Sequence, residues 1–273
     1  MAPLVPRAMW APAELADRLA CELIDRAGVQ HEAPIPIEDV AVRLGASVVP
    51  RQIHQEGRLI CHRSGATIIV ASDQPPARRR FTVAHELAHW ALRSPTLCSP
   101  LALRAKNAFK SEEVFCNTVA GALLLPRQWT VATFPEAADE SQQSLALVYR
   151  IARSANVSLS ATVVRLRDLC GWRRTLLHWT RERDQWIFDS EAGVMPFEQG
   201  LIIPGDSAAH ALAGAAAEAA AGGPTVQQWP LPLMIGNSDE DVWAEVSANR
   251  AGAVALIELP TYVTHDLDTK ITY

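Results

Sequence analysis

Residues 78–95 read RRRFTVAHELAHWALRSP and combine an apolar helical pattern with ionisable side chains at three interior positions. His85, Glu86 and His89 occupy these positions, although imidazole and carboxylate groups are costly to bury without partners. Residues i and i+4 lie on one face of a helix, so both imidazoles are expected to point in the same direction. Glu86 directly follows His85, so its side chain points about 100° away from that of His85 around the helix axis. The stretch therefore predicts a helix that presents two nitrogen donors with a carboxylate beside them.

This arrangement is the H-E-x-x-H pattern, in which two histidines bind Zn²⁺ and the glutamate acts on a water molecule. A bound zinc ion lowers the pKa of water to about 7. We expect Glu86 to take the proton of that water as general base and to pass it to the leaving amine. The residues predict zinc hydrolase chemistry, and Mn²⁺ stays open as an alternative metal.

The third metal ligand is expected from the next apolar helix, SEEVFCNTVAGALLLP at 111–126. Glu113 lies 24 residues after His89 and near the start of that helix. Its neighbour Glu112 is rotated by about 100° around the helix and is the weaker candidate. The predicted ligands are therefore His85, His89 and Glu113, with a fourth coordination position open to water.

Composition places the chain among soluble globular proteins. The 273 residues are 49% hydrophobic and 20% charged, with a net charge of −5, which argues against wholesale binding of nucleic acid or anionic membranes. The five cysteines form no C-x-x-C pair, so neither a disulfide scaffold nor a cysteine zinc site is expected. The N-terminus lacks the apolar core of a signal peptide, and no run is long enough to span a membrane. We expect a cytoplasmic protein.

The pattern before the histidine helix predicts small α and β elements. An amphipathic helix is expected over 12–27, and PIPIEDVAVRLGASVVP at 34–50 predicts a short helix, a stop at Gly45 and a strand. GRLICHRSGATIIVAS at 57–72 predicts two strands that turn at Ser64-Gly65. A loop is expected from about Ser94 to Leu101.

Three segments are expected along the chain. Residues 1–135 form a metallopeptidase domain, and a linker around Pro135 to Ser141 precedes two short helices in 136–171. From 172 to 273 the pattern changes to two hairpins, 175–190 and 242–259, with an alanine-rich helix over 206–224 between them. This last segment predicts a separate α+β domain.

Two motifs together resemble the ImmA/IrrE family of bacterial metallopeptidases. RRRFTVAHELAHWAL and EEVFCNTVAGALLLP are similar to the family patterns R-F-T-x-A-H-E-x-G-H and E-x-x-A-N-x-F-A-x-x-L-L-M-P. The resemblance covers about residues 12–170. It implies an α+β zincin-like fold, a small sheet plus the H-E-x-x-H helix, and it assigns the same ligands and the same base. The departures from the family pattern are apolar or small and leave the ligands unchanged: Ala88, Cys116 and Val119.

The resemblance also implies a substrate class. Members of the family are associated with cleaving helix-turn-helix repressors, which induces stress-response or mobile-element genes. Strand GATIIVAS at 65–72 could then offer a sheet edge to an extended repressor segment. Some relatives carry a GAF-like sensor domain, which makes 172–273 a candidate for such a domain.

The competing hypothesis is a DNA-binding or ligand-responsive regulator whose metal site is structural or inactive. The helix pair in 144–171 resembles a helix-turn-helix, and several arginines lie near it. Apolar helix pairs with solvated arginines are common, so packing beneath the peptidase or docking of the substrate is favoured over direct DNA binding. A Glu86→Gln variant separates the two hypotheses, because it should keep the metal and lose proteolysis.

Overall fold

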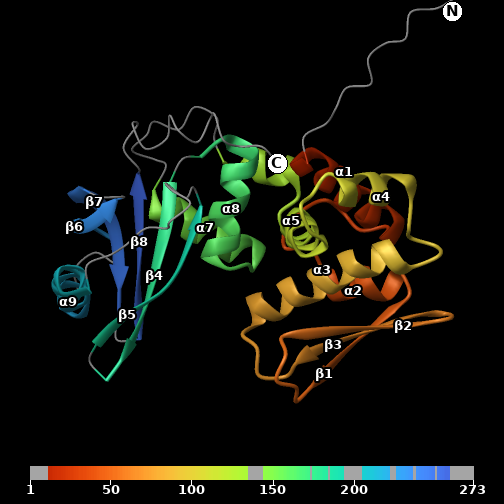
Figure 1. Ribbon diagram of the computed structural model, residues 1–273, viewed down its shortest axis with the longest axis horizontal. Coiled ribbons are helices and arrows are strands. Elements are labelled where there is room, and N and C mark those ends of the chain that lie inside the picture. Colours follow the sequence, from red (N-terminus) through yellow and green to blue (C-terminus); the bar gives the residue numbers. More distant parts are fainter. Residues whose placement is uncertain are drawn as a thin grey trace, which may run out of the picture. The chain divides into compact units, whose positions relative to one another are not determined.

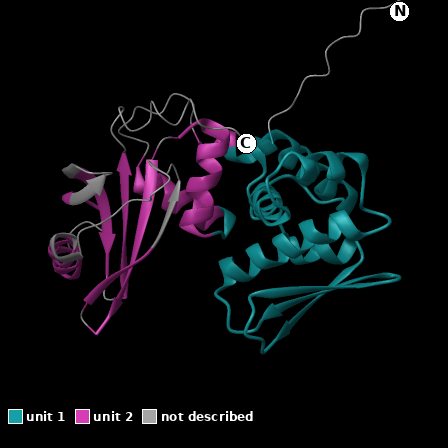
Figure 2. Cartoon of the chain, in the orientation of Figure 1, with its two compact units in different colours: residues 1–130, 155–157, 273 teal, residues 131–154, 158–272 magenta. Residues whose placement is uncertain are grey.

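The computed structural model describes residues 12–134, 144–172, 174–183, 185–193, 205–221, 226–235, 238–249 and 251–258 (Figure 1). They divide into two compact units (Figure 2). The N-terminal unit comprises the described residues up to Thr130 together with Ala155–Val157, and the C-terminal unit comprises the others. The expected linker around Pro135 to Ser141 lies outside the described residues, as does the predicted end of the alanine-rich helix at 222–224.

The helices of the N-terminal unit begin and end at local signals in the sequence. The predicted first helix is confirmed as α1 (Pro12–Ala27), which ends at Gly28, where φ is +63°. After α2 (Ile37–Arg43) the backbone turns at Gly45, where φ is +99°, a conformation that a side chain would strain. The other helices are α3 (Pro76–Arg93), α4 (Pro100–Asn107), α5 (Glu112–Leu124) and α6 (Arg127–Thr133), the last of which continues into the C-terminal unit.

A three-stranded sheet completes this unit, with the order β1-β3-β2. Its strands are β1 (Ala46–Arg51), β2 (Gly57–His62) and β3 (Gly65–Ala71). β1 is parallel to β3, and β2 is antiparallel to it. The expectation that residues 65–72 offer a free edge is therefore wrong. β3 is central because the two-residue turn places β2 on one side while β1 pairs on the other, so the free edges belong to β1 and β2.

Helix α3 packs one face into the core of this unit and leaves the histidines on another. Val83, Leu87 and Ala91 are fully buried, and α3 contacts β2, β3 and the neighbouring helices. Burial of these aliphatic side chains removes apolar surface from water, which contributes about 25 cal/mol per Å². The core thereby fixes the rotation of α3 about its axis, and this rotation decides where its polar side chains point.

A buried arginine ties α3 to two distant loops. Arg80 is 8% exposed, and its Nη2 donates to the carbonyl oxygen of Ile35 at 2.7 Å. Its Nε donates to the carbonyl oxygen of Asn156 at 3.1 Å. Burial lowers the pKa of Arg80, opposed by the charge of Glu38. The short segment 155–157 thus belongs to the N-terminal unit, although the helices on either side of it do not.

The C-terminal unit is a five-stranded antiparallel sheet with helices on both faces (Figure 1). Its helices are α7 (Leu145–Ala155), α8 (Leu159–Cys170) and α9 (Gly205–Ala220), and its strands are β4 (Arg174–Glu182), β5 (Gln185–Gly193), β6 (Gln227–Ile235), β7 (Ser238–Ala248) and β8 (Gly252–Glu258), in the order β5-β4-β8-β7-β6. One face packs Leu177, Val246 and Ile257 against Leu212 and Ala215 of α9. On the other face, α8 contacts β4 and β5.

Three described elements were not predicted from the sequence: α4, α6 and β6. The loop expected from about Ser94 to Leu101 ends earlier, because α4 begins at Pro100. Ser99 caps this helix by accepting a hydrogen bond from the amide of Ala102 at 3.2 Å. Strand β6 contains Pro230 and Pro232, which argue against a strand because proline donates no ladder hydrogen bond. β6 tolerates both prolines because it lies at the edge of the sheet.

Candidate metal centre

The two histidines of α3 meet one turn apart on the helix surface. Their rings are 4.8 Å apart between centroids, and the Nε2 atoms of His85 and His89 lie 3.1 Å from each other. His89 is buried, whereas His85 keeps partial exposure. The expected convergence of the two imidazoles is therefore present in the structure.

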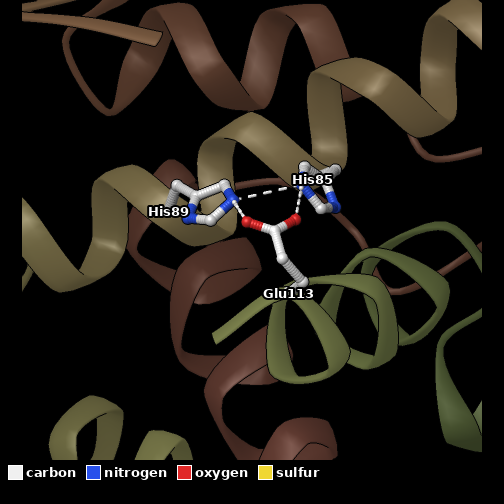
Figure 3. A group of neighbouring side chains, drawn as sticks. All are labelled: His85, His89 and Glu113. Atoms are coloured by element: carbon white, nitrogen blue, oxygen red, sulfur yellow. Dashed lines mark hydrogen bonds and ion pairs between the residues drawn. The ribbon is translucent and has the colours of Figure 1, made fainter. Parts of the chain in front are cut away.

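Helix α5 brings a carboxylate to the same point. Ser111 caps this helix, as predicted, by accepting a hydrogen bond from the amide of Val114 at 3.2 Å. In the second position of the helix, Glu113 places Oε2 3.3 Å from His85 Nε2 and Oε1 3.3 Å from His89 Nε2 (Figure 3). These three side chains, His85, His89 and Glu113, form the only group among the described residues whose donor atoms could surround a metal ion in this way.

The hydrogen bonds behind the histidines indicate which ring nitrogen is free. His85 Nδ1 lies 2.9 Å from Asn117 Oδ1, and His89 Nδ1 lies 2.8 Å from Glu112 Oε1. Asn117 Oδ1 is an acceptor, so His85 Nδ1 carries the hydrogen. His89 Nδ1 also lies 3.0 Å from the donor Arg93 Nη1, but its shorter contact with the ionised Glu112 favours the hydrogen on Nδ1. Each Nε2 then presents a lone pair. Two such lone pairs and a carboxylate then converge on one point, where they repel one another unless a cation lies between them. Two imidazole nitrogens and a carboxylate oxygen are also an established ligand set for zinc. The donor set therefore fits a divalent metal.

Glu112 and Arg93 form a polar pair beside this group. Glu112 Oε1 accepts from Arg93 Nη2 at 2.6 Å as well as from His89. Partial burial opposes the charge on Glu112, but the hydrogen bonds from His89 and Arg93 outweigh it and lower the pKa of that carboxyl. The sequence predicts Glu112 only as a weaker ligand candidate and indicates no role for Arg93. The spacing of Arg93, one helical turn after His89, is the signal that could have indicated the pair.

Glu86 lies apart from the convergent donors, beneath the start of β2. A Cβ atom added at Gly57 would lie 2.3 Å from Thr82 Cγ2 and 3.1 Å from Glu86 Oε1, so the strand passes directly over this carboxylate. Burial raises the pKa of Glu86, while the charge on His85 opposes the shift. A carboxylate with a raised pKa is a better proton acceptor near neutral pH than an ordinary surface glutamate.

The departures from the family pattern are all buried. Ala88, Cys116 and Val119 are fully buried and contribute to packing. Burial raises the pKa of the Cys116 thiol far above neutrality, so it stays protonated. The group that could hold a metal does not include this cysteine.

The remaining histidines fall outside this group. His62 lies 3.0 Å from the hydroxyl of Thr67, and His178 lies 3.2 Å from the carboxylate of Asp189, both on exposed strand surfaces. His210 is exposed on α9. His265 lies outside the described residues.

Residues 41–167 match a family model described as the IrrE N-terminal-like domain, Peptidase_M78. This part of the chain is similar to that family. The matched range includes α3 and α5, so the predicted ImmA/IrrE resemblance is confirmed and the chain contains a metallopeptidase-like domain.

Solved structures with a similar fold include one from Mycobacterium tuberculosis. A structure described as a Mycobacterium tuberculosis transcriptional regulator is 15% identical and aligns with 94% of this chain and 79% of its own length, with a TM-score of 0.49. No curated protein matches the chain. None of the described helices combines the length and apolar content needed to cross a membrane.

Proposed function

We propose that this protein is a zinc-dependent endopeptidase. His85, His89 and Glu113 bind the metal, and Glu86 is the general base. The observation that carries the proposal is the convergence of two Nε2 atoms and one carboxylate within 3.1–3.3 Å, with both Nδ1 atoms already engaged by acceptors. Mn²⁺ is the alternative occupant, because its preference for oxygen and nitrogen donors overlaps with that of zinc.

The chain's own residues supply the proton transfers. A bound zinc ion acts as a Lewis acid that polarises a peptide carbonyl and acidifies water. Glu86 accepts a proton from the attacking water at its carboxylate and returns it to the nitrogen of the leaving amine. Its partial burial beneath β2 favours this role, because desolvation makes the carboxylate more basic.

The free edge of β2 is the proposed binding site for the substrate backbone. The amide of Ala71 donates to the carbonyl of Glu56 at 3.1 Å, so this pair is a hydrogen-bonded one. Bonded and non-bonded pairs alternate in an antiparallel ladder, so Gly57, Leu59 and Cys61 direct their backbone groups away from β3. An extended peptide pairing there would pass over Glu86. This assignment replaces the incorrect one made for β3.

The proposed substrate is a helix-turn-helix repressor whose cleavage induces a stress-response or mobile-element regulon. Support comes from the family to which the peptidase segment is similar. A sheet edge beside the base suits a substrate that presents an extended linker rather than a helix. We place this reaction in the cytoplasm, where such repressors act.

The test is incubation of the zinc-loaded protein with the helix-turn-helix repressor encoded beside it. We expect one defined cut, mapped by mass spectrometry. Glu86→Gln should keep stoichiometric zinc and lose the cut, whereas Glu14→Gln, an exposed position on α1, should cleave like the wild type. Cleavage by Glu86→Gln at the wild-type rate would reject the proposed base.

The arginines near α7 and α8 give little support to the competing hypothesis of DNA binding. Arg165 is 3% exposed, and Arg167 pairs with Asp168 at 2.7 Å. Among the described arginines near this helix pair, Arg150 and Arg153 remain exposed on α7, whereas a DNA-binding protein can make roughly 6–10 phosphate contacts. We therefore assign the helix pair in 136–171 to packing or substrate docking.

We also propose that 172–273 forms a GAF-like sensor domain that follows the peptidase segment 1–135. Its antiparallel sheet, with α9 on one face, separates it in architecture from the peptidase segment. Thermal-shift measurements with small cellular metabolites would test this role, and stabilisation of the C-terminal unit by none of them would count against it.

A further inference from the structure

We propose that Glu112 is a positioning residue that holds the imidazole of His89 for metal binding, and that Arg93 keeps this carboxylate from becoming a ligand. The inference rests on the proposed metal site. It concerns how the chain distinguishes two adjacent carboxylates, Glu112 and Glu113, which have the same chemistry and begin the same helix.

The two carboxylates contact opposite edges of one imidazole. Glu113 Oε1 lies 3.3 Å from His89 Nε2, and Glu112 Oε1 lies 2.8 Å from His89 Nδ1. Consecutive helical positions differ by about 100° in direction, which places one side chain on each side of the ring. The His89 side chain is only 10% exposed, so the ring has little room to turn between them.

Arg93 holds the Glu112 carboxylate on the Nδ1 side of the His89 ring, away from the proposed metal position. Its Nη2 donates to Glu112 Oε1 at 2.6 Å. Its Nη1 donates to the carbonyl oxygen of His89 at 3.1 Å and lies 3.0 Å from His89 Nδ1, a longer contact than the 2.8 Å from that nitrogen to Glu112. The guanidinium is therefore anchored to the backbone of the residue whose imidazole it helps to orient. The Glu112 carboxylate bonds to both Arg93 and His89, whereas the Glu113 side chain is 69% exposed and points its two oxygens at the Nε2 atoms of the histidines (Figure 3).

A carboxylate that accepts the Nδ1–H of a metal-bound histidine strengthens metal binding. It fixes the Nδ1–H tautomer, aims Nε2 at the metal and makes the ring a stronger donor, and its loss costs about 10–100-fold in metal affinity. Asn117 performs the same orientation for His85 with a neutral amide oxygen. The charged acceptor on His89 is expected to be the stronger of the two, since hydrogen bonds to ionised acceptors are about twice as strong as neutral ones.

The experiment measures zinc affinity by competition with a chromophoric chelator in the full chain. Glu112→Ala should weaken zinc binding by about 10–100-fold. Glu112→Gln keeps an acceptor oxygen and should lose less than Glu112→Ala, and Glu113→Ala should lose more than either. Glu14→Ala removes an exposed ion-paired glutamate of the same unit and should bind zinc like the wild type.

Cobalt substitution reports on the ligand set without any assay of cleavage. Glu112→Ala should keep the visible absorption of a tetrahedral Co²⁺ site, while Glu113→Ala should change it. The reverse outcome would make Glu112 the ligand and overturn the inference. Unchanged zinc affinity in Glu112→Ala would also overturn it, although the proposed peptidase site would stand. A wild-type chain that binds no zinc would reject both.

A measurement on the wild type covers the case in which Glu112→Ala does not fold. Imidazole ¹H–¹⁵N spectra of the zinc-loaded protein should show His89 protonated at Nδ1, with a downfield proton that exchanges slowly with water. A rapidly exchanging or absent Nδ1 proton on His89 would mean that Glu112 does not hold the ring, and the inference would be rejected.

Discussion

Each unit of the molecule contains a cluster of ionisable side chains, and the two clusters differ in where their positive charge comes from. In the C-terminal unit, Glu245 pairs with Arg174 at 3.5 Å and accepts the amide of Leu145 at 2.6 Å, while Arg174 also pairs with Glu258 at 3.4 Å. In the N-terminal unit, the atoms that converge are nitrogen lone pairs and carboxylate oxygens. A cluster that contains its own cation is balanced within the fold, whereas a cluster of acceptors alone is suited to bind a cation from solution.

Removal of the metal should have the largest effect and should affect only one of the two clusters. Dialysis against a chelator should abolish proteolysis, and Zn²⁺ should restore it. Zinc at about 100 times its dissociation constant adds about 2.7 kcal/mol to the stability of the unit that binds it. Calorimetry with and without the chelator should show the N-terminal transition moving to lower temperature and the C-terminal one staying in place. If both transitions moved to lower temperature by the same amount, the proposed difference between the two clusters would be contradicted.

Glu86→Gln should separate metal binding from catalysis. Amide in place of carboxylate removes the proton acceptor, and loss of general base catalysis costs about 10²–10⁴-fold in rate. Metal content by atomic absorption should stay at the wild-type ratio, because Glu86 is not among the convergent donors. If zinc is lost together with activity, Glu86 belongs to the metal-holding group and the assignment of roles must change.

Gly57→Ala should reduce turnover while leaving the metal in place. The new methyl group would collide with Thr82, a stiff β-branched residue, and would press on Glu86. Displacement of a reacting group by about 1 Å can cost 100-fold, so we expect a fall in kcat of about 10–100-fold. Gly121→Ala is the matched control, because a Cβ there meets no neighbour within 4 Å. Wild-type kcat in Gly57→Ala would show that β2 does not constrain the base.

Arg174→Ala should destabilise the C-terminal unit without changing zinc affinity. It removes the ion-pair partner of Glu245, whose side chain is 13% exposed, and leaving a largely buried acceptor without its partner costs about 1–3 kcal/mol. Urea unfolding should detect the loss. Arg18→Ala breaks an exposed pair with Glu14 and should cost less than about 1 kcal/mol. A similar small cost for Arg174→Ala would mean that solvent already screens the inner pair.

The sequence predicted the peptidase segment well because its signals are local. Helical periodicity predicted α1 and α3, and the serine cap located the start of α5. The meeting of His85, His89 and Glu113 followed from helical spacing and the family motifs, and their role as metal ligands remains a prediction. Strand order could not be predicted in this way, because β1 pairs with β3 although no local sequence pattern relates the two segments. That is why β3 was mistaken for an edge strand.

The same limit explains the features that the sequence did not reveal. The partnership of Arg93 with Glu112 depends on how two helices pack, and Gly57 gains its importance only when β2 passes over Glu86. Strand β6 was missed for a different reason: its prolines contradict strand propensity, and only an edge position makes them acceptable.

The anchorage of Arg80 has a practical consequence for anyone who wishes to produce the peptidase portion by itself. A fragment that stops near residue 135 would omit Asn156, which accepts one of the two backbone hydrogen bonds of the Arg80 side chain. An orphaned buried donor costs about 1–3 kcal/mol, a large share of what holds a small domain together. Shortened versions should therefore extend beyond Val157, or replace Arg80 with an apolar residue of similar length.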